Sequence, residues 1–223
     1  MTQHGNASSP PPKGEIWLES SKEVLIRRAE ESDKEQIAEL ANMADGDTIS
    51  FIVKGNDPTA DTLRIYCEMI SEASNILSLR NCFVAERGRR LAGVANAFPA
   101  RMIESQLQDA RLTEREEFLR PLTELNDPRS YLLNNIAVAA ADRRIGIGSL
   151  LLEAVISEAR QKSFPCVTLH VWADNSDAIA FYRRFGFLIA AHAAVPWHPD
   201  LLHVGGSLLL RLDLQAGENV RQG

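Results

Sequence analysis

The feature that most constrains this chain is a loop with two glycines that joins an expected strand to an expected helix. The loop reads Arg143-Arg144-Ile145-Gly146-Ile147-Gly148-Ser149. The first turn of a helix leaves several backbone N–H groups without intrahelical partners, and the helix dipole adds positive potential there. The glycines remove side chains that would block close backbone approach, and the two arginines add charge. The loop therefore predicts an anion site, for which a phosphate or pyrophosphate is the natural ligand.

Two familiar nucleotide-binding patterns do not fit this loop. A dinucleotide fingerprint needs a third glycine three residues after Gly148, where the chain has Leu151. A Walker loop needs four residues between its glycines and then Lys with Ser or Thr, whereas one residue separates Gly146 from Gly148 and no Lys follows. Strand–glycine–helix turns also occur without a ligand, so the loop by itself leaves the ligand open.

A second group of residues lies about one strand and one turn downstream. Asn175 and Ala178 open an expected helix, and Tyr182 lies on the same side one turn beyond Ala178. An amide there can hydrogen-bond an amide-rich ligand, and a phenol can bond a sulfur or give it a proton. In the structural alternative, Asn175 is an N-cap and Tyr182 is a core aromatic residue.

The loop and the downstream residues together resemble the core of the Gcn5-related N-acetyltransferase (GNAT) superfamily. The loop pattern of that family is Gln or Arg, two residues, Gly, one residue, and Gly or Ala, and Arg143-x-x-Gly146-x-Gly148 matches it. The preceding Asn135-Ile136-Ala137-Val138 resembles its fourth strand, and residues 175–187 resemble its downstream signature, with Gly186-Phe187 at the end. The match covers roughly 131–187, whereas residues 23–98 agree in the order of elements.

The resemblance implies a mixed α/β fold of the α+β type. Its central sheet is mostly antiparallel, with about seven strands, and helices flank the sheet. Strands 4 and 5 are parallel and splay apart. We expect this domain over residues 22–215, between flexible tails at 1–21 and 216–223. The amino-terminal tail is polar and contains Ser9-Pro10-Pro11-Pro12, and it lacks the apolar segment of a secretory signal.

Hydrophobic spacing places the elements along this domain. Helices are expected at about 33–44, 59–77, 101–121, 146–163 and 175–185. Strands are expected at about 23–29, 82–85, 91–98, 131–138, 166–172, 187–190 and 207–214. We expect Asp45-Gly46-Asp47 to end the first helix. For the long segment 101–130, a role near the site and a plain surface insertion both stay open.

By similarity to the family, the pantetheine arm of acetyl-CoA would lie between the splayed strands as if it were a strand. The backbone of 136–138 would bond that arm, and the loop N–H groups would hold the pyrophosphate. Asn175 would contact the cofactor, and Tyr182 would lie near the thioester sulfur as the catalytic general acid. The expected cofactor-binding residues are Ile136, Ala137, Val138, Arg143, Arg144, Ile145, Gly146, Ile147, Gly148, Ser149, Asn175 and Tyr182.

The chemistry of a tyrosine suits this role. A free thiol has a pKa of about 8.5 and a tyrosine about 10, and a thiolate leaves more easily if it is protonated as it forms. A backbone N–H near Val138 can polarise the thioester carbonyl. The predicted function is an N-acetyltransferase that moves an acetyl (acyl) group from acetyl-CoA to an amine by direct attack in a ternary complex. The alternative is a non-catalytic acyl-CoA-binding or sensing module.

The general base stays unassigned. Many relatives carry a Glu on the fourth strand, where this chain reads Leu132-Leu133-Asn134-Asn135, and Asn cannot act as a base. His170 alternates with apolar residues and is interpreted as a core or surface histidine. The remaining possibilities are Glu86, Glu104, Glu116, Glu117, or a water held by Asn134 or Asn135.

The acceptor is expected to be an amine, on a small molecule or on a protein. In the family the amine pocket is built from variable segments, which here would be Met43–Asp57, Arg101–Ser130 and His192–Gly206. The formal net charge of −6 permits a cationic substrate and argues against a broad nucleic-acid surface.

Cysteine and histidine usage indicates neither a disulfide framework nor a metal site. The residues concerned are Cys67, Cys82, Cys166, His192, His198 and His203. We therefore expect no metal cofactor and a reducing, cytoplasmic compartment. The chain has no long apolar stretch, so we expect no membrane partner, and a homodimer is possible.

Overall fold

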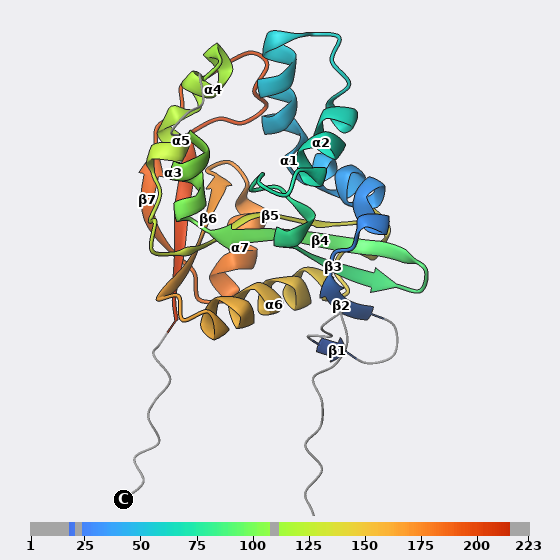
Figure 1. Cartoon of the computed structure of the whole chain (residues 1–223). Coiled ribbons are helices and arrows are strands. Elements are labelled where there is room, and N and C mark those ends of the chain that lie inside the picture. Colours follow the sequence, from blue (N-terminus) through green and yellow to red (C-terminus); the bar gives the residue numbers. More distant parts are fainter. Residues whose placement is uncertain (1–17, 21–23, 108–111, 215–223) are drawn as a thin grey trace, which may run out of the picture.

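The computed structural model describes residues 18–20, 24–107 and 112–214 as one eight-stranded sheet with helices on both faces (Figure 1). The strands are β1 Leu18–Ser20, β2 Val24–Arg28, β3 Cys82–Arg87, β4 Arg90–Pro99, β5 Tyr131–Val138, β6 Cys166–Trp172, β7 Leu188–Ala193 and β8 Ser207–Asp213. The α-helices are α1 Lys34–Asn56, α2 Thr62–Ser71, α3 Arg101–Leu107, α4 Glu114–Phe118, α5 Arg120–Glu124, α6 Ile147–Gln161 and α7 Ser176–Arg184. Short 3-10 helices are Glu31–Asp33, Leu79–Asn81 and Ala140–Asp142.

The sheet has the order β1-β2-β3-β4-β5-β6-β8-β7, and β5 and β6 form a parallel pair between antiparallel neighbours. Their ladder joins Tyr131–Leu133 to Val167–Leu169 and stops there, although both strands continue beyond it. On the other side, the pairing of β5 with β4 shifts register and leaves Asn134 as an extra residue. Such a bulge bends its strand, so β5 turns away from β6 at this point. The predicted mixed sheet with a splayed parallel pair is confirmed.

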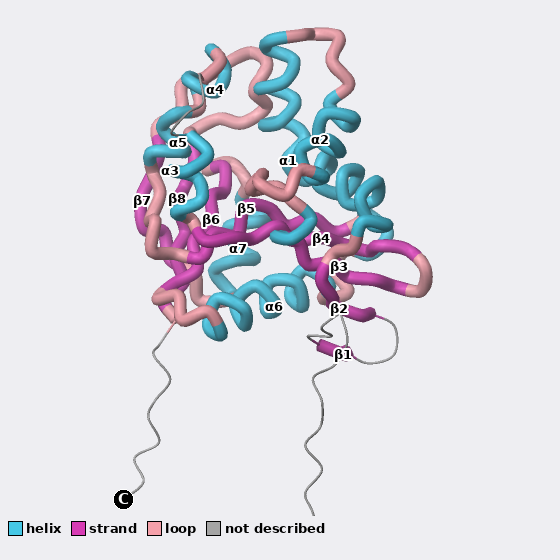
Figure 2. The backbone as a smooth tube through the Cα atoms, viewed as in Figure 1, coloured by secondary structure: helices cyan, strands magenta, loops and turns pink. Residues whose placement is uncertain are grey.

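Helices lie on both sides of the sheet, as Figure 2 shows. The two largest hydrophobic clusters lie between the sheet and these helices, one on each face. On one face α6 buries Leu151, Leu152 and Val155 completely, which agrees with the helical spacing of its apolar residues. On the other face α1 and α2 pack against β3 and β4, with Ile37 and Ile70 at 1% exposure. Both faces of the sheet are therefore covered by packed helices.

Several regions differ from the sequence-based expectation, beginning with two near the amino terminus. Leu18–Ser20, which we assigned to the flexible tail, forms β1 and pairs with β2, whose outer edge would otherwise present unpaired backbone groups. The helix α1 continues through Asp45-Gly46-Asp47, where we expected it to end. A glycine inside a helix costs about 1 kcal/mol relative to alanine, and burying Phe51 contributes about 1.5–3 kcal/mol in return. The remaining predicted tails, 1–17 and 216–223, lie outside the described residues.

The segment between β4 and β5 is broken into short helices instead of one long helix. Thr113 begins α4 with a capping box, in which its hydroxyl accepts from the Glu116 N–H and the Glu116 carboxylate accepts from the Thr113 N–H. Residues 108–111 before it lie outside the described residues. A local cap therefore begins a new helix at Glu114, inside the stretch where we expected one continuous helix.

Candidate active site

The loop after β5 is a strand-to-helix junction, as its sequence predicts. Gly146 is the N-cap of α6 with φ 95°, and Arg144 has φ 64°. These left-handed conformations are open to glycine but cost another residue about 1–2 kcal/mol. A side chain at Gly146 would meet no atom within 4 Å, so there is room beside the backbone of the loop.

The loop contains a run of unused backbone donors. Ser149 and Leu150 donate their N–H groups to the Gly146 carbonyl, which closes the first turn of α6. The N–H groups of 144–148 have no acceptor within the described ranges. Arg143 donates from Nε to the Val138 carbonyl at 3.2 Å, and its side chain is exposed like that of Arg144. Consecutive unpaired donors beside two exposed guanidinium groups match the requirements of an anion.

The end of β5, the loop and α7 meet at Gly148. A Cβ atom on Gly148 would lie 3.6 Å from the Phe181 ring and 3.7 Å from the Val138 side chain. Phe181 in turn contacts the neighbouring Tyr182, with ring centroids 5.1 Å apart. The fold therefore brings together the three segments that the sequence suggested separately.

Tyr182 lies on α7 with only 7% of its surface exposed, and its ring also packs against Phe187 at 5.7 Å. Its hydroxyl has no hydrogen-bond partner among the described residues. Burial raises the pKa of Tyr182 above that of an ordinary tyrosine, because the phenolate would lose its hydration. The residue is therefore a neutral phenol, and no described residue accepts its hydroxyl proton.

Asn175 is the N-cap of α7, which is the structural alternative that the sequence analysis gave for this residue. Its side-chain oxygen caps α7 by accepting from the Ala178 N–H at 3.1 Å. The residue is exposed, and its amide N–H groups have no acceptor among the described residues. The cap leaves these donors free for a ligand at the start of α7.

The last residues of β5 provide a strand edge without a strand partner. Residues 136–138 pair with β4, and no ladder joins them to β6. Ile136 and Val138 lie half-buried on the α6 side, whereas Ala137 is buried on the side of α1 and α2. An extended chain of amides can therefore bind in the gap between β5 and β6 as an added strand.

The glutamates suggested as bases are mostly engaged elsewhere. Glu86 pairs with Arg27 at 2.8 Å, Glu116 belongs to the α4 capping box, and Glu117 pairs with Arg120. Glu104 is exposed on α3.

Asn135, on the face of the sheet that α1 and α2 cover, is better placed than these glutamates to hold a water that could act as the base. It is buried beside the Asn134 bulge and donates to the Tyr66 hydroxyl at 3.2 Å. Its side-chain oxygen is buried and lacks a partner within the described part of the chain. A water at this oxygen would satisfy it, which keeps the water-held-by-Asn135 hypothesis open.

His170 forms a structural contact with the loop that precedes β5. Its Nε2 lies 2.9 Å from the Leu125 carbonyl oxygen, and burial lowers the pKa of His170. All three cysteines are free thiols. Among the described residues, no group of three or more His, Cys, Asp or Glu is arranged to hold a metal ion. No helix in the described ranges combines the length and apolarity needed to cross a membrane.

The three segments that the resemblance assigns to the amine pocket contact one another. We define the aromatic cluster as Phe51 of α1, Phe118 of α4 and His198 of the β7–β8 connection, with ring centroids 4.9–5.6 Å apart. Arg115 lies over the Phe51 ring and pairs with Asp200 at 2.6 Å. The segment 101–130 is therefore bound to α1 and to the β7–β8 connection through side-chain contacts.

Sequence reasoning missed one group of residues beside the loop. Asp142, immediately before Arg143, is fully buried and is bound by Arg87 and Arg90. The only sequence signal was an acidic residue directly before two arginines, together with an arginine-rich β3–β4 turn. Neither pattern indicates by itself that the two places are in contact.

Comparison with known proteins supports the family resemblance that the sequence motifs indicated. A family model described as "Acetyltransferase (GNAT) family" matches residues 56–187, which is more than half of the chain. The probable N-acetyltransferase san of Drosophila melanogaster is 35% identical over 65 residues, or 29% of this chain and 35% of that protein. The matched segments span 35–38% of the curated relatives, about a third of their length.

Two solved structures illustrate the likeness of the fold. An N-acetyltransferase from Staphylococcus aureus Mu50 superposes with a TM-score of 0.62 at 19% identity, over 84% of this chain and 99% of that one. The PaiA N-acetyltransferase from Thermoplasma acidophilum, solved in complex with coenzyme A, gives 0.52 at 13% identity, over 86% and 100%.

Proposed function

Because this chain belongs to the GNAT family of acetyltransferases, we propose that it transfers an acetyl group from acetyl-CoA to an amine. The observation that carries the proposal is the convergence at Gly148, where the unpaired strand edge, the donor-rich loop and the tyrosine-bearing helix meet. Each of the three matches one chemical part of acetyl-CoA, namely the amide-containing arm, the pyrophosphate and the thioester.

The residues present fit this co-substrate. The N–H groups of 144–148 would hold the pyrophosphate, with charge from Arg143 and Arg144. The edge of 136–138 would bond the pantetheine amides, and the free amide donors of Asn175 would add a contact near the start of α7. The open space beside Gly146 allows the phosphates to approach the backbone.

The chain's contribution to the reaction is positioning and proton transfer. The acceptor nitrogen forms a bond to the thioester carbonyl carbon, the C–S bond breaks, and the sulfur leaves with the electron pair. Tyr182 donates its hydroxyl proton to that sulfur, and its raised pKa keeps the proton in place until then. The backbone N–H near Val138 would stabilise the developing charge on the carbonyl oxygen.

The acceptor must also lose a proton before or during the attack. A water bound to the free Asn135 oxygen would accept this proton and pass it to solvent, from which Tyr182 would regain a proton after the thiol has formed. Asn135 lies beside the bulge where β5 leaves β6. The segments of the aromatic cluster would line the amine pocket on this side. A small-molecule amine and a protein amine both fit the proposal, which requires no metal, nucleic acid or membrane. We also propose a cytoplasmic enzyme on the three free thiols, and a homodimer as a possible assembly.

One observation favours a second candidate, a non-catalytic acyl-CoA-binding module. The strand position where relatives carry a Glu base is occupied by Asn134 and Asn135. An assay of thiol release from acetyl-CoA, with a panel of small amines and short peptides, separates the two. Release that depends on an added amine supports the transferase. Tight coenzyme A binding without release for any amine supports the binding module.

A further inference from the structure

The strongest unassigned feature is the buried carboxylate of Asp142 directly in front of the loop. It lies at the end of the 3-10 helix Ala140–Asp142 with 0% of its surface exposed. Burying a charge without partners costs much free energy, so the groups around the Asp142 carboxylate decide whether it can stay ionised. Arg90 donates to both of its oxygens, at 2.5 and 3.0 Å, and Arg87 donates at 2.9 Å. The Arg90 guanidinium and then that of Arg87 hold the pKa of this carboxyl below its usual range.

The two arginines belong to a firmly paired part of the sheet. Arg87 ends β3 and Arg90 begins β4, and they are direct partners across the hairpin. A backbone bond from the Ala139 N–H to the Ala92 carbonyl at 2.9 Å joins the same two regions. The start of the loop is therefore attached to the β3–β4 hairpin through both side chains and backbone.

The segment held in this way precedes a strained backbone. Arg144, two residues after Asp142, has φ 64°, and Gly146 has φ 95°. The conformation of Arg144 is strained for a residue with a Cβ atom and persists only where the surroundings determine it, whereas glycine adopts its own without strain. The donor groups of 144–148 follow directly from this point.

We infer that Asp142, held by Arg87 and Arg90, is a positioning residue that fixes the loop in the shape that receives the pyrophosphate of coenzyme A. The inference rests on the proposed function. In this arrangement the arginines hold the Asp142 carboxylate, and Asp142 thereby ties the residue that precedes the loop to the β3–β4 hairpin. A loop held in place before binding loses less conformational entropy when the ligand arrives.

Calorimetric titration of purified Asp142→Asn with coenzyme A and with pantetheine tests this inference, because pantetheine lacks the pyrophosphate. We expect the Kd for coenzyme A to rise about tenfold, which corresponds to about 1.4 kcal/mol of binding free energy lost with the preorganisation of the loop. The Kd for pantetheine stays at the wild-type value. Arg90→Gln should weaken coenzyme A binding in the same direction, and the double variant should lose little more than either single variant.

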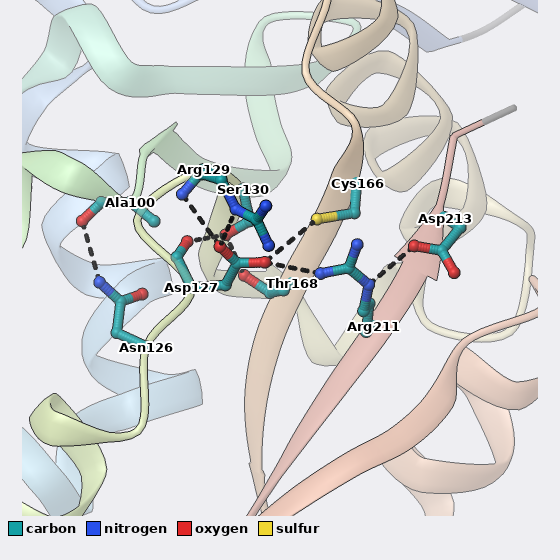
Figure 3. A network of polar contacts seen from close by, with 9 residues as sticks. All are labelled: Ala100, Asn126, Asp127, Arg129, Ser130, Cys166, Thr168, Arg211 and Asp213. Carbon is teal, nitrogen blue, oxygen red and sulfur yellow. Dashed lines mark hydrogen bonds and ion pairs between the residues drawn. The ribbon is translucent and has the colours of Figure 1, made fainter. Parts of the chain in front are cut away.

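Asp127→Asn is the matched control. Asp127 is also an ion-paired carboxylate beside β5, bound by Arg211 at 2.6 Å and near Cys166, as Figure 3 shows. It precedes the opposite end of β5 from the loop. Its variant loses a comparable ion pair, and we expect wild-type affinity for coenzyme A.

Several outcomes would overturn the inference. If a folded Asp142→Asn protein binds coenzyme A with wild-type affinity, Asp142 does not position the loop. Tighter binding by Asp142→Asn combined with weaker binding by Arg90→Gln would mean that the arginines contact the phosphates themselves. Equal losses for coenzyme A and pantetheine would mean a general structural defect. If Asp142→Asn does not fold, the half-exposed Arg90→Gln carries the same comparison. If the wild-type protein binds no coenzyme A, the proposed function fails first, and the inference falls with it.

Discussion

The two halves of the site are built in different ways. On the proposed cofactor side, consecutive backbone N–H groups of one loop have no acceptor among the described residues, and the fully buried carboxylate of Asp142 lies directly before that loop. On the proposed acceptor side, the aromatic cluster joins three segments that lie far apart in sequence. The adjacent ion pair joins Arg115 to Asp200, whose side chain is 60% exposed. The first half presents backbone groups of consecutive residues, and the second is built from side chains of three separate segments. The cofactor should therefore be common to the family, whereas the acceptor should be particular to this chain.

The largest expected effect is that of Tyr182→Phe. Removing the acid should lower kcat about 100-fold or more, because proton donation to a leaving group contributes on this scale. The Kd for coenzyme A should stay near the wild-type value. Tyr131→Phe is the control: its buried hydroxyl donates to Glu158 at 2.6 Å beneath α6, so its loss should lower stability by about 1–3 kcal/mol and spare kcat. Steady-state kinetics in which Tyr182→Phe turns over at the wild-type rate would refute the acid assignment.

The pH dependence should reflect the acceptor and not Tyr182. An alkyl amine has a pKa of about 10.4, so its neutral fraction rises about tenfold per pH unit below that value. The raised pKa of Tyr182 keeps the phenol protonated through the same range, so no acid is lost as pH rises. We expect kcat/KM for an alkyl amine to climb steadily from pH 6 to pH 9. A fall in kcat/KM between pH 8 and pH 9 in a stable enzyme would contradict a buried Tyr182 as the acid.

The variants Gly146→Ala and Gly205→Ala compare the proposed cofactor side of the site with the proposed acceptor side. Gly146 and Gly205 have φ 95° and 82°, so alanine at either position should cost about 1–2 kcal/mol of stability. Gly146→Ala should in addition weaken coenzyme A binding about tenfold, since it disturbs the donors of the loop. Gly205→Ala, in the β7–β8 connection, should bind coenzyme A normally. If the two variants bind coenzyme A with equal affinity in a titration, the division into a cofactor side and an acceptor side is wrong.

The smallest effect is expected from Asp200→Asn. An exposed ion pair with Arg115 adds little, so the unfolding temperature should scarcely move. The KM for coenzyme A should be unchanged, whereas the KM for the amine should shift by less than about fivefold. A larger change in the KM for the cofactor than in that for the amine would argue that the aromatic cluster belongs to the cofactor side.

The same contrast explains how much of the molecule could be predicted from sequence. The loop and α7 were readable because their chemistry is local: Gly146 is required by its left-handed backbone, and Asn175 caps the helix that carries Tyr182. The splayed strands were predicted through the resemblance to a known family and not from hydrophobic spacing.

Other features were not readable because they depend on contacts between distant residues. The helix α1 passes through Asp45-Gly46-Asp47, where local propensity indicated a break, and Phe51 beyond it is buried against Leu119 and Leu201. Asp142 and its arginines are 52 and 55 positions apart, and nothing local in either segment signals the pair. The general base has no local signature either, because Asn135 would act through a water held by tertiary structure.

The most direct test of the central claim is the unfolding temperature of the wild-type protein with coenzyme A, ATP or NAD at equal concentration. A ligand that binds the native state and not the unfolded state raises this temperature, by an amount that grows with the logarithm of its concentration relative to its Kd. The loop, the free edge of β5 and the position of Tyr182 predict stabilisation by coenzyme A and little or none by the two nucleotides. Stabilisation by ATP or NAD without any by coenzyme A would contradict the account.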